Sequence, residues 1–296
     1  MSLSVIMGAL ELGLIYAIMS MGVLVSFRIL NIPDLTIDGS FTLGVAVSAI
    51  LTVQGMPILG LILGMAAGAV AGIVTAFLQT KLKVQVILAG ILTMTALYSI
   101  NLHVMGNKPN VPLLGKETIF TRIQNLLPAS VANLGAVVLI LLLVVAALYL
   151  FLKTQIGMSL RATGDNEDMV RASSINSDAM KILGLAIANA LVSLSGAVLA
   201  QYQGFADANG GIGTMVIGLA SIIVGEALLG RRSMIMSFLS AIIGAIIYRF
   251  ILTIALRIGL PASDLKLMSA VLVVIAISIP VIKGEIVKRR NRNAKA

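Results

Sequence analysis

LGAVVLILLLVVAALYLFL, residues 134–152, is an apolar run without a charged side chain. A helix needs about 20 mostly apolar residues to cross the hydrocarbon core of a bilayer, so this run predicts a membrane-spanning helix. The same rule, applied outward in both directions, predicts nine spans, at residues 3–27, 41–54, 57–79, 84–104, 134–152, 182–202, 214–229, 234–256 and 267–282.

Two of these predicted spans, 41–54 and 214–229, are short for a full crossing. Short spans interrupted by glycine are often discontinuous helices that line a cavity, because irregular backbone persists at membrane depth only inside protein. A misplaced helix boundary explains the shortness equally well, and the sequence leaves both interpretations open.

The composition also indicates a membrane protein. Of the 296 residues, 59% are hydrophobic and 11% are charged, whereas soluble domains have about 45–50% and about 25%. A soluble domain this apolar would expose patches large enough to aggregate, which excludes a soluble enzyme, a disordered chain and a nucleic-acid-binding domain. The predicted fold is all-α, a polytopic bundle of about 8–10 transmembrane helices in a lipid bilayer, forming one domain over residues 1–296.

The net charge of +9 is interpreted as a topology signal rather than as a nucleic-acid surface. No cleavable signal peptide is expected, because the first basic residue is Arg28, after the first span. With the N-terminus outside and the C-terminus in the cytoplasm, 15 of the 21 Lys and Arg residues fall on the cytoplasmic side and 5 outside, in agreement with the positive-inside rule. We therefore predict a multi-pass protein of the cell membrane in this orientation.

Motifs for catalysis or cofactor binding are not found. The only GK pair, Gly115–Lys116, lacks the rest of a phosphate-binding loop. There is no G-x-S-x-G elbow or H-E-x-x-H helix. Without cysteine, and with His103 as the only histidine, neither a disulfide nor a zinc site is expected. The sequence predicts a protein that is not an enzyme and holds no cofactor or metal.

Three charged residues fall clearly within predicted spans: Glu11, Glu226 and Arg249. Such charges usually face a partner or water. Glu11 and Arg249 lie at matching depths below the outer surface, so they can form an intramembrane ion pair; alternatively, each faces a cavity or a polar neighbour separately. Glu226 and Arg249 differ in depth by roughly 18 Å, which argues against a direct pair.

Two further segments carry structural signals. Residues 31–40, NIPDLTIDGS, predict a loop or a helix break at the mouth of a cavity, where Asp34 and Asp38 keep the segment solvated. The alternative is a plain cytoplasmic turn. In the third span, glycines recur every four residues and share one helix face, which favours close helix packing; they are Gly60, Gly64, Gly68 and Gly72.

The cytoplasmic segment 157–181 contains a predicted short helix capped by Asp165, with Asp168 three residues later. The helix runs through Met169, Val170 and Ala172 and ends near Ser174, and Asn176 or Ser177 caps the next span. A transport chain without its own energy source that presents such a helix suggests docking onto an ATPase, with Met169, Val170 and Ala172 as the contact face.

Residues 157–200, GMSLRATGDNEDMVRASSINSDAMKILGLAIANALVSLSGAVLA, resemble the signature of permease subunits in branched-chain amino acid and ribose-type ATP-binding-cassette importers. The first spans are similar to the N-terminal pair of that family, with NIPDLTIDGS as the intervening loop. The resemblance covers about residues 1–55 and 155–230. This chain has Ser174 where the family has glycine before Ile175 and Asn176, which puts the turn that ends the short helix in doubt.

The resemblance implies a type II-like importer permease that works as a pair of copies, most simply a homodimer. Two ATPase subunits bind below it and an extracytoplasmic substrate-binding protein docks above. The resemblance also implies amino acid uptake, with aromatic amino acids among the candidates. It assigns ATPase coupling to the cytoplasmic helix, here Gly164, Asp165, Asn166, Met169, Val170, Ala172 and Ser173.

Other interpretations remain at this stage. The substrate can be a sugar or nucleoside, and the chain can be a stand-alone secondary transporter or a channel-like structural protein. Secondary transporters often show internal repeats and buried acidic coupling sites, and the sequence shows no convincing repeat and few intramembrane acids.

Overall fold

The computed structural model describes residues 3–125, 129–261, 264–265, 267–272, 274 and 278. Its long helices are α1 (Leu3–Val23), α2 (Thr36–Val53), α3 (Pro57–Thr80), α4 (Val86–Val104), α6 (Ala129–Lys153), α9 (Ser177–Gln203), α10 (Thr214–Leu229) and α11 (Met234–Arg257). The shorter elements are a π-helix, η1 (Leu24–Ile29), the helices α5 (Ile119–Gln124), α7 (Gln155–Asp165) and α8 (Glu167–Ala172), and the strands β1 (Asn110–Pro112) and β2 (Phe205–Asp207).

Seven helices in the described part of the chain are long and apolar enough to cross a membrane, and α10 is a shorter apolar helix. They match eight of the nine predicted spans and confirm an all-α, polytopic bundle. The ninth predicted span, 267–282, lies largely outside the described residues.

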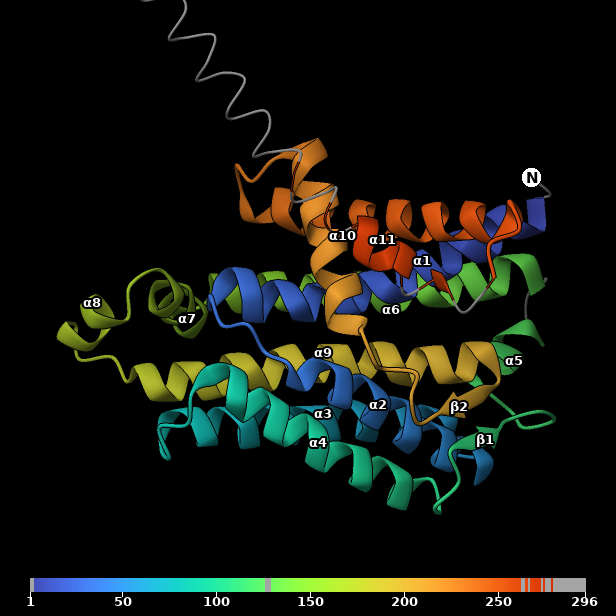
Figure 1. Ribbon diagram of the computed structural model, residues 1–296, viewed down its shortest axis with the longest axis horizontal. Helices are drawn as coiled ribbons and strands as arrows, with labels where there is room; N and C mark the ends of the chain where they lie inside the picture. Colours follow the sequence, from blue (N-terminus) through green and yellow to red (C-terminus); the bar gives the residue numbers. More distant parts are fainter. Residues whose placement is uncertain are drawn as a thin grey trace, which may run out of the picture.

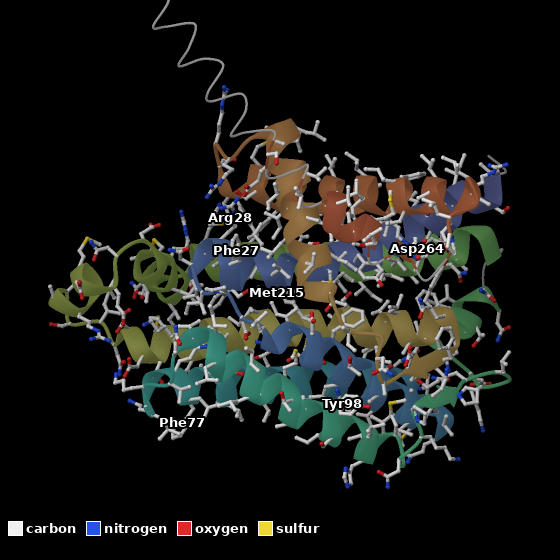
Figure 2. The ribbon with its side chains drawn as sticks, in the orientation of Figure 1. Phe27, Arg28, Phe77, Tyr98, Met215 and Asp264 are labelled. Atoms are coloured by element: carbon white, nitrogen blue, oxygen red, sulfur yellow. The ribbon has the colours of Figure 1, made fainter. Side chains whose placement is uncertain are left out.

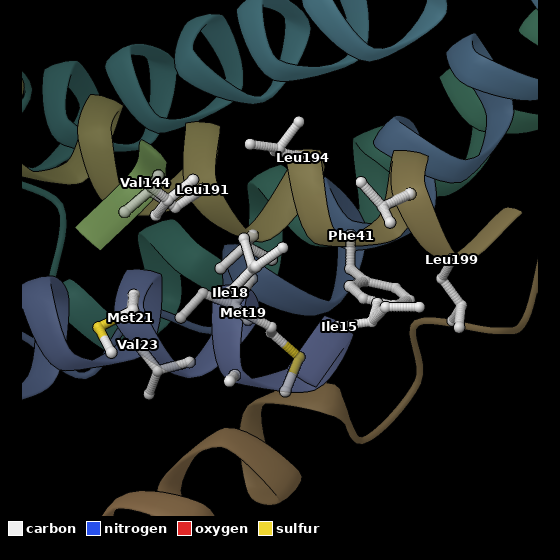
Figure 3. Close-up of a cluster of buried hydrophobic side chains, with 14 of the residues drawn as sticks. Ile15, Ile18, Met19, Met21, Val23, Phe41, Val144, Leu191, Leu194 and Leu199 are labelled. Atoms are coloured by element: carbon white, nitrogen blue, oxygen red, sulfur yellow. The ribbon is translucent and has the colours of Figure 1, made fainter. Parts of the chain in front are cut away.

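The helices are arranged in layers around α9 (Figure 1). α1, α2 and α9 are central, because more than two thirds of the residues in the most apolar stretch of each helix are buried. In α3, α4 and α6, a third or fewer of these residues are buried. Side chains such as Phe77 of α3 and Tyr98 of α4 therefore point away from the protein (Figure 2). The core between α1, α2 and α9 includes Ile15, Ile18 and Phe41, all fully buried (Figure 3).

The four glycines of α3 form the packing face that the sequence predicted. All four are buried. A Cβ at Gly68 would overlap Ser193 of α9, and a Cβ at Gly72 would overlap the carbonyl oxygen of Leu185. Glycine is required at these positions because the backbones of α3 and α9 approach too closely for a side chain.

The same succession of elements occurs twice along the chain: a long helix, then a non-helical segment, then a helix that begins inside the bundle. In the first unit, α1 and η1 are followed by residues 31–35 and then α2; in the second, α9 is followed by residues 204–213 and then α10. α10 runs across the long helices rather than along them (Figure 1). The second predicted span, 41–54, is short because its start is misplaced: α2 begins at Thr36 and is long enough to cross a membrane. The seventh corresponds to α10, a shorter apolar helix of 16 residues.

Apart from Arg249, which lies within α11, the described Lys and Arg residues collect at the two ends of the bundle. The end formed by η1, α7, α8 and the α10–α11 loop is here called the basic end; it holds Arg28, Lys81, Lys83, Lys153, Arg161, Arg171, Lys181, Arg231 and Arg232. The opposite end carries α5 and an antiparallel ribbon of β1 and β2, in which Asn110 pairs with Asp207.

Candidate functional site

α7 and α8 project from the basic end beyond the ends of the spanning helices (Figure 1). α7 begins directly after α6, where the Thr154 hydroxyl accepts a hydrogen bond from the Gly157 N–H at 3.1 Å. This helix was not predicted from the sequence, although Thr154 is a recognisable N-cap. A Cβ at Gly164 would overlap the carbonyl oxygen of Ile29, so this glycine lets α7 pack against η1.

The predicted cap at Asp165 is wrong. Asp165 is the last residue of α7, and the chain becomes extended at Asn166, with φ −156°. The Asn166 side-chain oxygen accepts a hydrogen bond from the Met169 N–H at 3.0 Å and caps α8. Because α7 continues through Asp165, the break that frees the first N–H groups of α8 falls one residue later than the sequence suggested.

The predicted contact face of α8 also needs correction at Val170, which is 1% exposed and packs inside the chain. Met169, Ala172 and Ser173 are exposed. Met169 and Ala172 of α8, together with its C-cap residue Ser173, are here called the exposed face of α8, and Val170 fixes the helix to the rest of the protein.

The turn after α8 forms although glycine is absent from it. Ser174 adopts φ +60°, the left-handed conformation that usually favours glycine. The Ile175 N–H reaches back to the Val170 carbonyl at 3.2 Å. The Asn176 side chain then accepts from the Ala179 N–H at 3.1 Å, which confirms Asn176 as the cap of α9.

A network of charges fastens α8 to the start of α9. Glu167 accepts hydrogen bonds from Lys181 at 2.6 Å, from Arg171 at 2.7 Å and from the Ser177 hydroxyl at 3.1 Å. The Lys181 hydrogen bond outweighs partial burial and, with the charges of Lys181 and Arg171 and the Ser177 bond, holds the pKa of Glu167 below its ordinary value. α8 is therefore held against α9 by charge-assisted bonds.

The segment 31–40 is not a solvated loop as predicted, because both of its carboxylates accept hydrogen bonds from groups inside the protein. Asp34 is 0% exposed. It accepts hydrogen bonds from the Thr36 N–H at 2.9 Å and from the Asn189 amide at 2.7 Å. Asp38 accepts from the backbone N–H groups of Gly213 and Met215, each at 2.8 Å. The two aspartates cap the first turns of α2 and α10.

The predicted ion pair of Glu11 with Arg249 is absent among the described residues, and each side chain has a different neighbour. Glu11 accepts a hydrogen bond from the Tyr202 hydroxyl at 2.7 Å. The Arg249 guanidinium lies 5.5 Å from the centre of the Tyr16 ring. Glu11 is thus bonded by an aromatic side chain of α9, whereas Arg249 packs over an aromatic ring of α1 and its Nε is buried without a hydrogen-bond partner among the described residues.

Sequence reasoning missed the partners of Glu226, which bonds to Arg28 and lies 3.3 Å from the Nε of Arg231. The two residues could have been paired from their depth in the membrane, because Arg28 ends the first span and Glu226 lies near the same end of the seventh.

Among the described residues, no group of three His, Cys, Asp or Glu side chains could hold a metal ion.

Comparison with known proteins shows one matching family. Residues 5–277 match the family model described as "Branched-chain amino acid transport system / permease component". The chain is 38% identical to the tyrosine transport system permease protein of Clostridioides difficile, over 92% of this chain and 90% of the relative.

Two further relatives are less similar or cover less of the chain. A protein of Rickettsia prowazekii described as uncharacterized is 33% identical over 93% of this chain and 98% of its own length. The autoinducer 2 import system permease protein of Yersinia enterocolitica is 34% identical over 42% of this chain and 34% of its own length. No solved structure is significantly similar to the chain.

Proposed function

This chain belongs to the family of branched-chain amino acid transport system permease components, and from this premise we propose that it forms the membrane pathway of an ATP-driven importer of amino acids. The family is a transport permease and not a catalytic one. In the proposed system a separate ATPase subunit hydrolyses ATP, a substrate-binding protein delivers the solute, and a second copy of the chain completes the pathway.

The proposed substrate is an amino acid with an aromatic side chain. The support is the 38% identity, over nearly the full length of both chains, to a relative named as a tyrosine transport permease. The autoinducer 2 permeases match only about two fifths of this chain and support a sugar-like substrate less.

The observation that carries the coupling mechanism is the attachment of α8. Its exposed face, Met169, Ala172 and Ser173, is free to meet a partner, while Glu167 bonds it to Lys181 of α9 at 2.6 Å. α9 is the central helix and packs against α1, α2 and α3. A push on α8 by the ATPase therefore reaches the centre of the bundle through rigid contacts.

The proposed orientation places the basic end in the cytoplasm, as the positive-inside rule requires. The ATPase then docks at α7 and α8. The opposite end, with α5 and the β1–β2 ribbon, faces outside and receives the substrate-binding protein.

Uptake into sealed vesicles tests the proposal. The permease is reconstituted with its ATPase and binding protein, and uptake of radiolabelled tyrosine, leucine and ribose is measured with and without ATP. ATP-dependent uptake of tyrosine, exceeding that of ribose, supports the proposal. Uptake by the permease alone, without the ATPase, would identify a secondary transporter, and uptake of ribose alone would contradict the amino acid substrate.

A further inference from the structure

A polar pocket of about 350 Å³ opens at the basic end, between η1, α7 and the loop that joins α10 to α11. Six charged side chains line it: Arg28, Arg161, Arg231, Arg232, Asp165 and Glu226. Figure 2 shows Arg28 at this end of the bundle, beside the α10–α11 loop. The pocket lies apart from the exposed face of α8, because Met169, Ala172 and Ser173 are not among its lining residues.

The charges of the pocket are unbalanced. Four guanidinium groups face two carboxylates, and Glu226 is already bonded to both Arg28 and Arg231. Arg161 and Arg232 form no ion pair among the described residues, and the Nε of Arg28 is buried without a hydrogen-bond partner. Arg161 and Arg232 are exposed, so their guanidinium donors are accessible to a ligand, whereas the unpartnered Nε of Arg28 is buried. Guanidinium donors without partners favour an anion with several acceptor oxygens.

A helix terminus adds to this positive potential. Ser233, which lines the pocket, is the N-cap of α11, and its hydroxyl accepts from the Met236 N–H at 3.2 Å. The positive end of the α11 dipole therefore faces the same space as the arginines, an arrangement that attracts phosphate.

The pocket is amphipathic and lies at the level where the spanning helices end. Leu24 and Phe238, both at most 2% exposed, form apolar lining beside the arginines. α7 and α8 extend farther from the bundle than this level (Figure 1). In a bilayer, the ends of spanning helices coincide with the phospholipid headgroups. Inorganic phosphate gains nothing from an apolar lining, whereas the first methylene groups of a phospholipid's acyl chains would pack against it.

We propose that this pocket binds the phosphate headgroup of an anionic phospholipid from the leaflet at the basic end, with Arg161 and Arg232 as its main ligands. Basic pockets between membrane helices recognise such headgroups. The lipid contacts both α7 and the α10–α11 loop, so it links the segment after α6 to α10. The inference needs only the membrane location and is independent of the transported substrate.

Lipid retention tests the proposal. The full-length permease is purified with its co-purifying subunits, and phosphatidylglycerol and phosphatidylcholine are titrated while native mass spectrometry counts the lipids bound per chain. The test variant is Arg161→Gln/Arg232→Gln. The control, Lys83→Gln/Lys153→Gln, removes the same charge from the basic end outside the pocket, and circular dichroism checks the helix content of both.

The account expects one tightly bound phosphatidylglycerol per chain in the wild type and in the control, and at least tenfold weaker binding in the test variant. The variant Arg161→Lys/Arg232→Lys, which keeps the charge, should retain part of the binding. Equal phosphatidylglycerol affinity in the test and control variants would overturn the proposal. Displacement of the lipid by millimolar inorganic phosphate would overturn it in favour of a free-anion site. Unchanged lipid binding with loss of the ATPase from the test variant would assign the pocket to protein docking instead.

Discussion

The carboxylate of Asp38 in α2 accepts a hydrogen bond from the backbone N–H of Met215 in α10, at 2.8 Å. The same side chain also accepts from the Gly213 N–H and from the Thr214 hydroxyl. Two helices that begin inside the bundle are thus joined at their first turns. In a membrane interior this contact satisfies N–H groups that water cannot reach.

Asp38→Ala should therefore destabilise the protein. Hydrogen bonds to charged acceptors contribute about 1.5–3 kcal/mol each, so losing all three should cost about 4.5 kcal/mol or more of unfolding free energy. Asp38→Asn keeps one acceptor oxygen and should lose about half as much. Thermal unfolding followed by circular dichroism measures both. Asp207→Ala, which removes a turn hydrogen bond at an exposed site, is the control, and an equal effect of Asp207→Ala and Asp38→Ala would contradict the account.

The Glu167 network should make α8 sensitive to acid. Because the folded-state pKa of Glu167 is below its ordinary value of 4.5, its stabilisation is complete above that value and is lost as the pH falls through the lower folded-state pKa. A spin label on Met169→Cys, in a chain without native cysteine, should gain mobility as the pH falls below that range. In the Glu167→Gln background the label should be mobile already at pH 7 and change little on acidification; an immobile label there would contradict the role of Glu167.

Glu11 should be coupled to Tyr202 more strongly than to Arg249. Tyr202→Phe removes the hydroxyl that bonds the buried carboxylate, at a cost of about 1–3 kcal/mol. Glu11→Gln in the Tyr202→Phe background should then have a smaller effect than in the wild type. A double-mutant cycle of Glu11→Gln with Arg249→Met should be close to additive, whereas a direct buried pair would give a coupling of about 3–5 kcal/mol.

The orientation of the bundle is testable with single cysteines. Ala172→Cys at the basic end should react with a membrane-impermeant maleimide only in inside-out vesicles. Lys108→Cys, between α4 and β1 at the opposite end, should react only in right-side-out vesicles. Reaction of Ala172→Cys from outside intact cells would reverse the proposed topology.

The sequence predicted what hydrophobic length and spacing determine. Eight predicted spans coincide with helices, and the glycine face of α3 packs as its four-residue spacing requires. Caps were predicted less well, because Asp165 and Asn166 have equivalent capping chemistry and only the length of α7 decides between them. Burial of Asp34 depends on how distant helices are placed side by side, which local patterns do not encode. The Arg28–Glu226 contact could have been predicted from the matching depth of the two residues, but depth alone does not show which helices are neighbours.

The central claim, that α8 transmits the ATPase motion to the bundle, is tested most directly with Ala172→Glu in the reconstituted complex. The measurement is ATP hydrolysis stimulated by the substrate-loaded binding protein, with co-purification of the ATPase. Ala179→Glu, an equivalent change in the first turn of α9 where an acidic side chain suits the helix dipole, is the control. Because an unpaired charge buried in an interface costs about 2–5 kcal/mol, the account predicts at least tenfold lower stimulation or loss of ATPase docking for Ala172→Glu alone. Normal stimulation together with normal docking in Ala172→Glu would contradict it.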